Sequence, residues 1–434
     1  MATRIDARDK GFEAAFRALL DAKRETGIDV DDAVARILAD VRKRGDEAVI
    51  AYTKKFDGFD LTPKTMRVTT NEIATACNRV NKDVLAALEF AAGRISDFHR
   101  RQLPQGLDFT DASGLRLGYR WTPIAAVGLY VPGGTATYPS SVLMNALPGK
   151  IAGVDRVAMV VPAPKGEINP LVLAAAAIAG VDEVYRIGGA QAIGALAYGT
   201  KTVAAVDKII GPGNAYVAAA KRRVFGAVGI DMIAGPSEVL VLADAANDPA
   251  WIAADLLAQA EHDEAAQAIL ITDDGGFADR VTKAVESHLK TLPRAATAAK
   301  SWRHFGAVIV VGKLVDALPL IDRLAPEHLE IAVEEPEPLA AGVRNAGAIF
   351  LGRYAPEAVG DYVAGSNHVL PTARSARFSS GLGVIDFLKR TSLIGGDAST
   401  LARIGPAAIT LAKAEGLDAH ALSVAIRLNV PKDG

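Results

Sequence analysis

Glu327 and His328 are neighbours in the mostly apolar stretch LAPEHLEI, residues 324–331. A histidine, with a pKa of about 6.5, is the usual proton acceptor at neutral pH, and a carboxylate beside it could activate water. Pro326 suits the first turn of a helix, where an acidic residue is also favourable, so a helix start would explain Glu327 without chemistry. It would not explain His328. The two are therefore either ordinary surface groups or two proton carriers aimed at one substrate.

A second set of side chains has the chemistry of metal ligands. Gln259 and His262, in DLLAQAEHD, are three residues apart near the predicted end of a helix, so both can face one point. One histidine with one glutamine is not by itself a zinc signature. Nitrogen and oxygen donors without thiolate do suit zinc, or a similar divalent ion that keeps positions open for substrate. Two further pairs lie in stretches that contain glycine: Asp361 with His368, and Glu415 with His420.

Three glycine-containing turns follow predicted strands: YVPGGTATYPSS (130–141), RIGGAQAIG (186–194) and IIGPGNAYV (209–217). Ligands bind at the carboxyl ends of parallel strands, where glycine admits a close approach and the next helix favours phosphate. Gly211 and Gly213 begin like a dinucleotide fingerprint, but Tyr216 occupies the third glycine position. Plain tight turns remain the alternative. The sequence contains no GxxxxGK[ST] loop, which argues against ATP or GTP.

The elements that must position these residues alternate between apolar strands and helices. Four strand–helix units occupy about residues 123–225, and a second alternation begins near residue 238. This predicts two doubly wound, Rossmann-like α/β/α domains with parallel sheets, a helical N-terminal segment and a helical C-terminal tail. The expected bounds are 1–25 for the N-terminal segment, 26–129 plus 238–378 for a discontinuous first domain, 130–237 for the second domain and 379–434 for the tail.

Composition narrows the function classes. A net charge of −2 and an isoelectric point near 6.4 give no electrostatic footprint for nucleic acid, and no basic run suggests a membrane surface. The N-terminus is polar and the apolar runs fall short of the ~20 residues that span a bilayer, so we expect a cytoplasmic protein. Cys77 is the only cysteine, which excludes an internal disulfide and thiolate metal clusters.

The sequence resembles the histidinol dehydrogenase family. Nine motifs occur in the family's order between about residues 130 and 420: YVPGG, YPSSVLMN, GGAQAIGALAYGT, GPGNAYV, GIDMIAGPSEVLV, DLLAQAEHD, APEHLEI, GDYVAGSNHVLPT and EGLDAHA. The resemblance implies a homodimer with NAD and one zinc ion per subunit. It implies oxidation of L-histidinol to L-histidine through bound L-histidinal, the last step of histidine biosynthesis, with NAD on the 130–237 side and dimer contacts from the tail.

The resemblance also assigns roles motif by motif. His328 would be the general base, Glu327 would activate water, and zinc would orient the substrate. In the family the tail histidine comes from the partner subunit, so one site would need two chains. The other assignments are metal ligands at Gln259, His262, Asp361 and His420; substrate contacts at Ser237, Gln259, His262, His328, Asp361, Glu415 and His420; and NAD contacts at Tyr130, Gln191 and Asn214.

Several alternatives stay open. Asp263 stands where a glycine is expected and is either a partner for His262 or a solvated charge, and the role of His368 is undecided. A paralogue could oxidise another small alcohol, such as a sulfonated diol, although Glu415 and His420 favour histidinol. A metal-dependent hydrolase or amidase would not need three ligand-ready turns. A non-catalytic nucleotide-binding or assembly protein would not need the acid–base pair.

Overall fold

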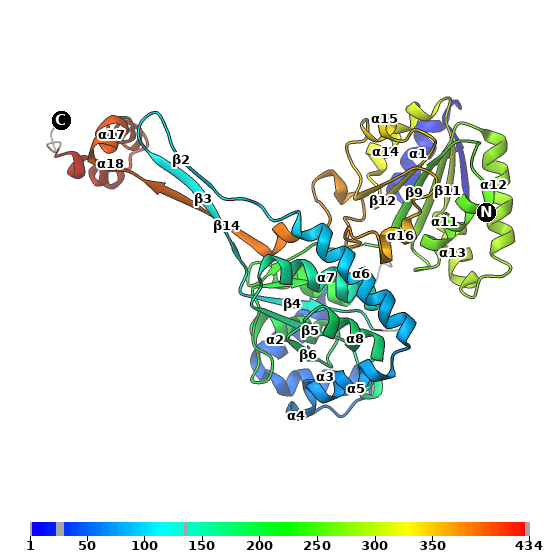
Figure 1. The fold of residues 1–434 in the computed structure, drawn as a ribbon, viewed down its shortest axis with the longest axis horizontal. Coiled ribbons are helices and arrows are strands. Elements are labelled where there is room, and N and C mark those ends of the chain that lie inside the picture. The colour runs from blue at the N-terminus through cyan, green and yellow to red at the C-terminus, as the bar shows by residue number, and fades with distance from the viewer. Residues whose placement is uncertain (1, 23–29, 134–137, 234, 430–434) are drawn as a thin grey trace.

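The computed structural model describes residues 2–22, 30–133, 138–233 and 235–429, whose strands form two parallel sheets and one antiparallel ribbon (Figure 1). Helices cover both faces of each parallel sheet. The predicted doubly wound α/β fold is therefore confirmed. Among the described helices, none combines the length and the apolar character that crossing a bilayer requires.

The six-stranded sheet has the order β1-β11-β10-β9-β12-β13, with parallel pairs throughout. Val239 and Val241 of β9 pack with α11, α12 and α13, whereas Leu240 and Leu242 pack with α1 and α14. Because successive side chains point to opposite faces, a strand covered on both sides is buried at every position, and EVLVLA is buried throughout and apolar after Glu238. The elements are β1 (Thr3–Asp6), α1 (Phe12–Asp21), β9 (Glu238–Ala243), α11 (Pro249–Ala260), β10 (Gln267–Thr272), α12 (Gly275–His288), α13 (Ala295–Phe305), β11 (Ala307–Val310), α14 (Leu318–Leu324), β12 (His328–Ala332), α15 (Glu337–Ala340), β13 (Ala348–Leu351) and α16 (Glu357–Tyr362).

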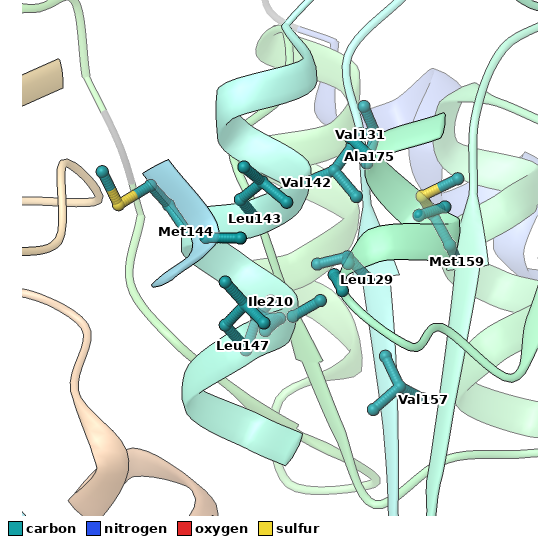
Figure 2. Close-up of a cluster of buried hydrophobic side chains, with 14 of the residues drawn as sticks. Leu129, Val131, Val142, Leu143, Met144, Leu147, Val157, Met159, Ala175 and Ile210 are labelled. Carbon is teal, nitrogen blue, oxygen red and sulfur yellow. The ribbon is translucent and has the colours of Figure 1, made fainter. Parts of the chain in front are cut away.

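The five-stranded sheet has the order β6-β5-β4-β7-β8, again parallel. Leu129 of β4 and Val131 just after it join the cluster with α7 and α8 that Figure 2 shows, and Tyr130 joins the opposite cluster with α2, α9 and α10. Leu143 of α7 is fully buried, which contributes roughly 1.5–3 kcal/mol. The elements are α2 (Asp31–Arg44), α3 (Asp46–Asp57), α4 (Pro63–Met66), α5 (Thr70–Arg79), α6 (Lys82–Arg100), β4 (Ala126–Tyr130), α7 (Pro139–Ala152), β5 (Arg156–Val160), α8 (Pro170–Ile178), β6 (Glu183–Tyr185), α9 (Gly189–Tyr198), β7 (Lys208–Ile210), α10 (Ala215–Val224) and β8 (Gly229–Ile230).

The antiparallel ribbon projects away from both sheets and carries the C-terminal helices at its far end (Figure 1). Its order is β14-β3-β2, and β14 pairs with β3 from Leu388 opposite Pro123 to Gly395 opposite Arg116. The elements are β2 (Leu107–Thr110), β3 (Arg116–Pro123), β14 (Leu388–Gly395), α17 (Ala398–Ala414) and α18 (Asp418–Ala425).

The structure differs from the expected division of the chain in three places. The N-terminal segment 1–25 is not wholly helical, because β1 forms an edge of the six-stranded sheet. The tail 379–434 includes β14, whose LKRTSLIG is too polar to be recognised as a buried strand. Within 26–129, helices α2 to α6 pack on the five-stranded sheet rather than with 238–378, because the apolar stripe of a helix does not specify which sheet it will cover. The expected boundary at residues 25 and 26 lies outside the described residues.

A buried ion pair fixes the turn after β7. The side chains of Lys221 and Asp231 are 4% and 1% exposed and are bonded to each other. Lys221 also donates to the Gly211 carbonyl at 2.9 Å, and the Gly211 N–H donates to Asp231 at 2.8 Å. Gly211 has φ of +105°, and a Cβ there would lie 2.1 Å from the Tyr130 carbonyl oxygen, so glycine is required. The Lys221–Asp231 pair therefore bonds both the N–H and the carbonyl of Gly211, at a position that only glycine can occupy.

Replacing Asp231 by Asn should destabilise the fold by about 3–5 kcal/mol, because it leaves the Lys221 ammonium buried without its counter-charge. Denaturant unfolding followed by circular dichroism would measure the change. Asp60→Asn is the matched control, since Asp60 pairs with Lys54 at 2.6 Å on the exposed surface and should be close to neutral. Equal stability of Asp231→Asn and the wild type would show that the buried pair contributes nothing net.

Candidate active site

A cavity of about 490 Å³ lies between the two sheet units. The turns that follow β4 and β7 form one wall, and the segments that lead into β9 and β12 form another. The five-stranded sheet thus presents its carboxyl ends, as expected for ligand binding, whereas the six-stranded sheet presents amino ends. Residues singled out from the sequence that line this cavity are Tyr130, Asn214, Ser237, Gln259, His262, Asp263, Glu327, His328, Asp361 and His368. Residues 134–137 of the first turn lie outside the described residues.

Glu327 and His328 do not begin a helix, so that expectation is wrong. Helix α14 ends at Leu324, Ala325 follows in the left-handed region with φ of 46°, and His328 is the first residue of β12. Because β12 lies between β9 and β13, His328 is held on both sides, opposite Val239 and Ala348. The pair is therefore fixed at the start of an interior strand, which is hydrogen bonded to a neighbouring strand on each side.

The hydrogen bonds of this pair define its chemistry. His328 Nδ1 is 3.0 Å from the Glu238 carbonyl oxygen, and a carbonyl only accepts, so Nδ1 carries the proton and Nε2 is left as the basic nitrogen. Burial lowers the pKa of His328, against the opposing effect of the Asp361 carboxylate. The Glu327 carboxylate accepts the N–H of Glu238 at 2.9 Å. A neutral imidazole and a carboxylate thus stand side by side at the cavity.

Asp361 lies among three imidazoles. Its Oδ2 is 4.0 Å from His262 Nε2, and its Oδ1 is 3.8 Å from His328 Nε2 and 3.9 Å from His368 Nδ1. His368 also donates from Nδ1 to the Asp361 carbonyl at 3.0 Å, while its Nε2 is 3.2 Å from the Ser141 hydroxyl. These bonds position His368 as a support for Asp361, a role that the sequence left undecided.

Gln259 and His262 approach the same point from the end of α11. Gln259 is fully buried, whereas the His262 side chain is 37% exposed toward the cavity. The 4.0 Å between His262 and Asp361 is within the span of two ligand atoms that each lie ~2.1 Å from one ion. Amide oxygen, imidazole and carboxylate form a donor set that suits zinc. Asp263 is exposed and accepts the N–H of Ala265 at 2.8 Å, which favours the solvated charge.

Buried acidic residues that were not predicted from the sequence also lie near this point. Glu357 is 2% exposed. One of its carboxylate oxygens could bind the same metal ion as His328 and Asp361, since the three donor atoms lie within 4.8 Å of one another. Burial raises the pKa of Glu357 well above its ordinary value, and the nearby carboxylates of Asp361, Glu330 and Glu327 act in the same direction. The four-residue spacing of Glu357 and Asp361 puts both on one face of α16 and was the available signal.

The proposed NAD contacts have different environments. The Tyr130 hydroxyl accepts the Gly189 N–H at 3.1 Å, and burial raises the pKa of Tyr130 to about 12, so it stays neutral. Asn214 caps α10 by accepting the N–H groups of Tyr216 and Val217. Gln191 is buried in α9 and does not line the cavity; its Oε1 has no hydrogen-bond partner among the described residues. Tyr130 and Asn214 therefore have structural roles in addition to the proposed contacts with NAD.

Glu415 and His420 are not near the cavity of their own chain. They lie at the end of α17 and in α18, at the far tip of the ribbon and well separated from α11 and α16 (Figure 1). Both are exposed, and large apolar side chains are exposed around them: Leu411, Leu417, Leu422 and Ile426. The tail therefore cannot complete this site within one chain as it is folded here.

Comparison with known proteins gives consistent results. A family model described as histidinol dehydrogenase matches residues 21–428. The chain is 64% identical to a histidinol dehydrogenase from Rhodospirillum rubrum over 99% of each chain, and 64% identical to one from Rhizobium meliloti over 100% of each. A crystal structure of histidinol dehydrogenase from Elizabethkingia anophelis superposes with a TM-score of 0.94 at 36% identity, covering 99% of this chain and 98% of that chain.

Proposed function

Because the chain belongs to the histidinol dehydrogenase family, we propose that its cavity oxidises L-histidinol to L-histidine by two successive hydride transfers to NAD. The family makes the chain an oxidoreductase of histidine biosynthesis. The balanced reaction consumes one histidinol, two NAD and one water, and yields one histidine carboxylate, two NADH and three protons. A cytoplasmic location is part of the proposal, because cytoplasmic protein synthesis consumes the amino acid.

The observation that carries the proposal is the pairing of His328 and Glu327 in one cavity. In the first step, His328 Nε2 takes the alcohol proton while hydride leaves the carbinol carbon, which forms the aldehyde. Glu327 then takes a proton from water as the water oxygen bonds to the aldehyde carbon, and His328 gives its proton to the aldehyde oxygen, which forms the hydrate and frees Nε2 again. In the second step, His328 takes a hydroxyl proton of this hydrate as the second hydride departs and the carboxyl group forms. The oxidations and the hydration thus use different bases, His328 and Glu327, which are both hydrogen bonded to the backbone of Glu238.

Zinc fits the donor set beside this pair. Gln259, His262 and Asp361, with His420 of the partner subunit, would hold it, and the bound ion would orient the imidazole and amino groups of the substrate. Ser237 of the same chain, which lines the cavity, and Glu415 of the partner subunit would complete the substrate contacts. Enclosure in the cavity would also keep the reactive aldehyde from escaping between the two steps.

NAD would bind over the turns after β4, β6 and β7, with Tyr130, Gln191 and Asn214 as proposed contacts. The glycines of these turns and the helix N-termini that follow them support a pyrophosphate there. NAD bound there would supply the hydride acceptor for each of the two oxidations. Tyr130 and Asn214 line the cavity, which supports their proximity to the reacting carbon.

We also infer that the active unit is a homodimer in which the tails are exchanged. The ribbon carries Glu415 and His420 away from their own chain, and the exposed leucines around them need cover (Figure 1). A second copy would bury these side chains and bring the two polar residues to the cavity. Of the four proposed zinc ligands, only His420 does not line the cavity of its own chain, which supports this arrangement.

NADH absorbance on addition of L-histidinol tests the function. The zinc-loaded protein with excess NAD should form about two NADH per histidinol consumed, because the oxidation removes two hydrides. One NADH per histidinol would mean that the reaction stops at the aldehyde. Absence of NADH from folded, zinc-loaded protein would contradict the proposed reaction.

A further inference from the structure

Glu357 and Gln259 meet in the wall of the cavity. Gln259 is fully buried at the end of α11, and Glu357 is 2% exposed as the first residue of α16. With the NH₂ group of Gln259 toward Glu357, both ends of the amide have suitable partners, whereas the opposite orientation would set the amide oxygen against the Glu357 oxygens. In this orientation its nitrogen is bonded to Glu357 Oε1 and lies 3.3 Å from Oε2. The amide oxygen is therefore turned away from Glu357.

Glu357 is itself held in place by a buried polar cluster. Its backbone N–H donates to Glu330 Oε1 at 2.5 Å, and Glu330, 3% exposed in β12, is also hydrogen bonded to Asp255. Asp255 lies four residues before Gln259 on α11, so both face this cluster from one side of the helix. The cluster thus joins α11, β12 and α16, and the Glu357 carboxylate has little freedom to move away from Gln259.

We propose that Glu357 is a positioning residue that fixes the amide of Gln259 with its oxygen toward the zinc ion. This inference rests on the proposed function, in which Gln259 is a zinc ligand. An amide binds zinc through oxygen, and a buried amide that could rotate would present its NH₂ group part of the time. Hydrogen bonds that orient metal ligands typically contribute 10–100-fold to metal affinity. The competing role for Glu357 is direct ligation, since its carboxylate lies within 4.8 Å of ligand atoms of His328 and Asp361.

Two substitutions of Glu357 separate these roles. Glu357→Gln keeps an oxygen that can accept from Gln259 but loses the carboxylate, whereas Glu357→Leu has no acceptor. Zinc affinity of the full-length chain, measured by competition with a chromogenic chelator, should fall about 10–100-fold in Glu357→Leu and stay close to wild type in Glu357→Gln. An equal, large loss in both variants would identify a direct ligand and overturn the positioning role. Unchanged affinity in Glu357→Leu would overturn it too.

A double-mutant cycle tests whether Glu357 acts through Gln259. In a Gln259→Ala background, Glu357→Leu should cause no further loss of zinc affinity, because the group that it orients is gone. Additive losses would contradict the inference. Circular dichroism establishes folding of each variant, and Glu357→Met, which also lacks an acceptor oxygen, replaces the leucine variant if that does not fold. If the wild type binds no zinc, the proposed metal site falls and this inference with it; if it binds zinc and Glu357→Leu binds equally well, only the inference falls.

Discussion

Glu327→Gln should convert histidinol to histidinal at close to the wild-type rate and be slowed about 10²–10⁴-fold in the oxidation of the aldehyde. Only the second half of the reaction needs a base to activate water, whereas both halves need the proton acceptor His328. His328→Gln should therefore slow both steps. The glutamine in place of Glu327 keeps an oxygen that can accept the Glu238 N–H, so the backbone around β9 should be retained.

Rapid-mixing absorbance with enzyme in excess over histidinol separates the two steps. The wild type should form two NADH without a pause, and Glu327→Gln should form one quickly and the second slowly. His304→Gln is the control, because His304 is an exposed histidine outside the cavity and its loss should change neither phase. Equal slowing of both phases in Glu327→Gln would contradict the division of labour between the two groups.

The sequence predicted the fold class because both sheets are built from strands that are buried on two faces. EVLVLA of β9 and QAILIT of β10 have no exposed position, and each is followed by a helix, a pattern that is typical of parallel sheets. By contrast, β1 and β14 form edges or a projecting ribbon and carry mostly polar side chains. Their pairing depends on strands more than 250 residues away in the chain, which local patterns do not specify.

Helix was predicted at residues 324–331 because Pro326 and Glu327 are typical of a first turn. HLEIA forms a strand instead, because β9 and β13 provide hydrogen-bonding partners on both sides. Its apolar positions, Leu329 and Ile331, alternate as a strand requires, but a run of five residues is too short to decide between the two. Tertiary pairing decided the conformation.

Most candidate site residues line one cavity, and they were predicted from their match to the family's motifs rather than from their spacing in the sequence. Glu357 and Glu330 were missed, since an acidic residue in a sequence is ordinarily expected at the surface. Both are almost completely buried here. Burial of several carboxyl groups beside imidazoles is stable only if polar or cationic partners compensate, and this makes the region suited to a bound cation.

Neither His328→Gln nor His420→Ala should be active alone, but a mixture of the two chains should recover about one quarter of the wild-type sites. Random assortment in a dimer gives half heterodimers, and each of these has one cavity with an intact His328 and an intact tail from the other chain. The other cavity carries both defects. This expectation follows from the position of α18, which lies far from the cavity of its own chain (Figure 1).

Mixing these two variants tests most directly whether two chains build one site. The chains would carry different affinity tags, be unfolded and refolded together with zinc, and be purified through both tags before the NADH assay with L-histidinol. Recovery of about half the wild-type activity per purified heterodimer is the expected result, since one of its two cavities is intact. Inactive heterodimers, or full activity of His420→Ala on its own, would contradict a site completed by the partner's tail.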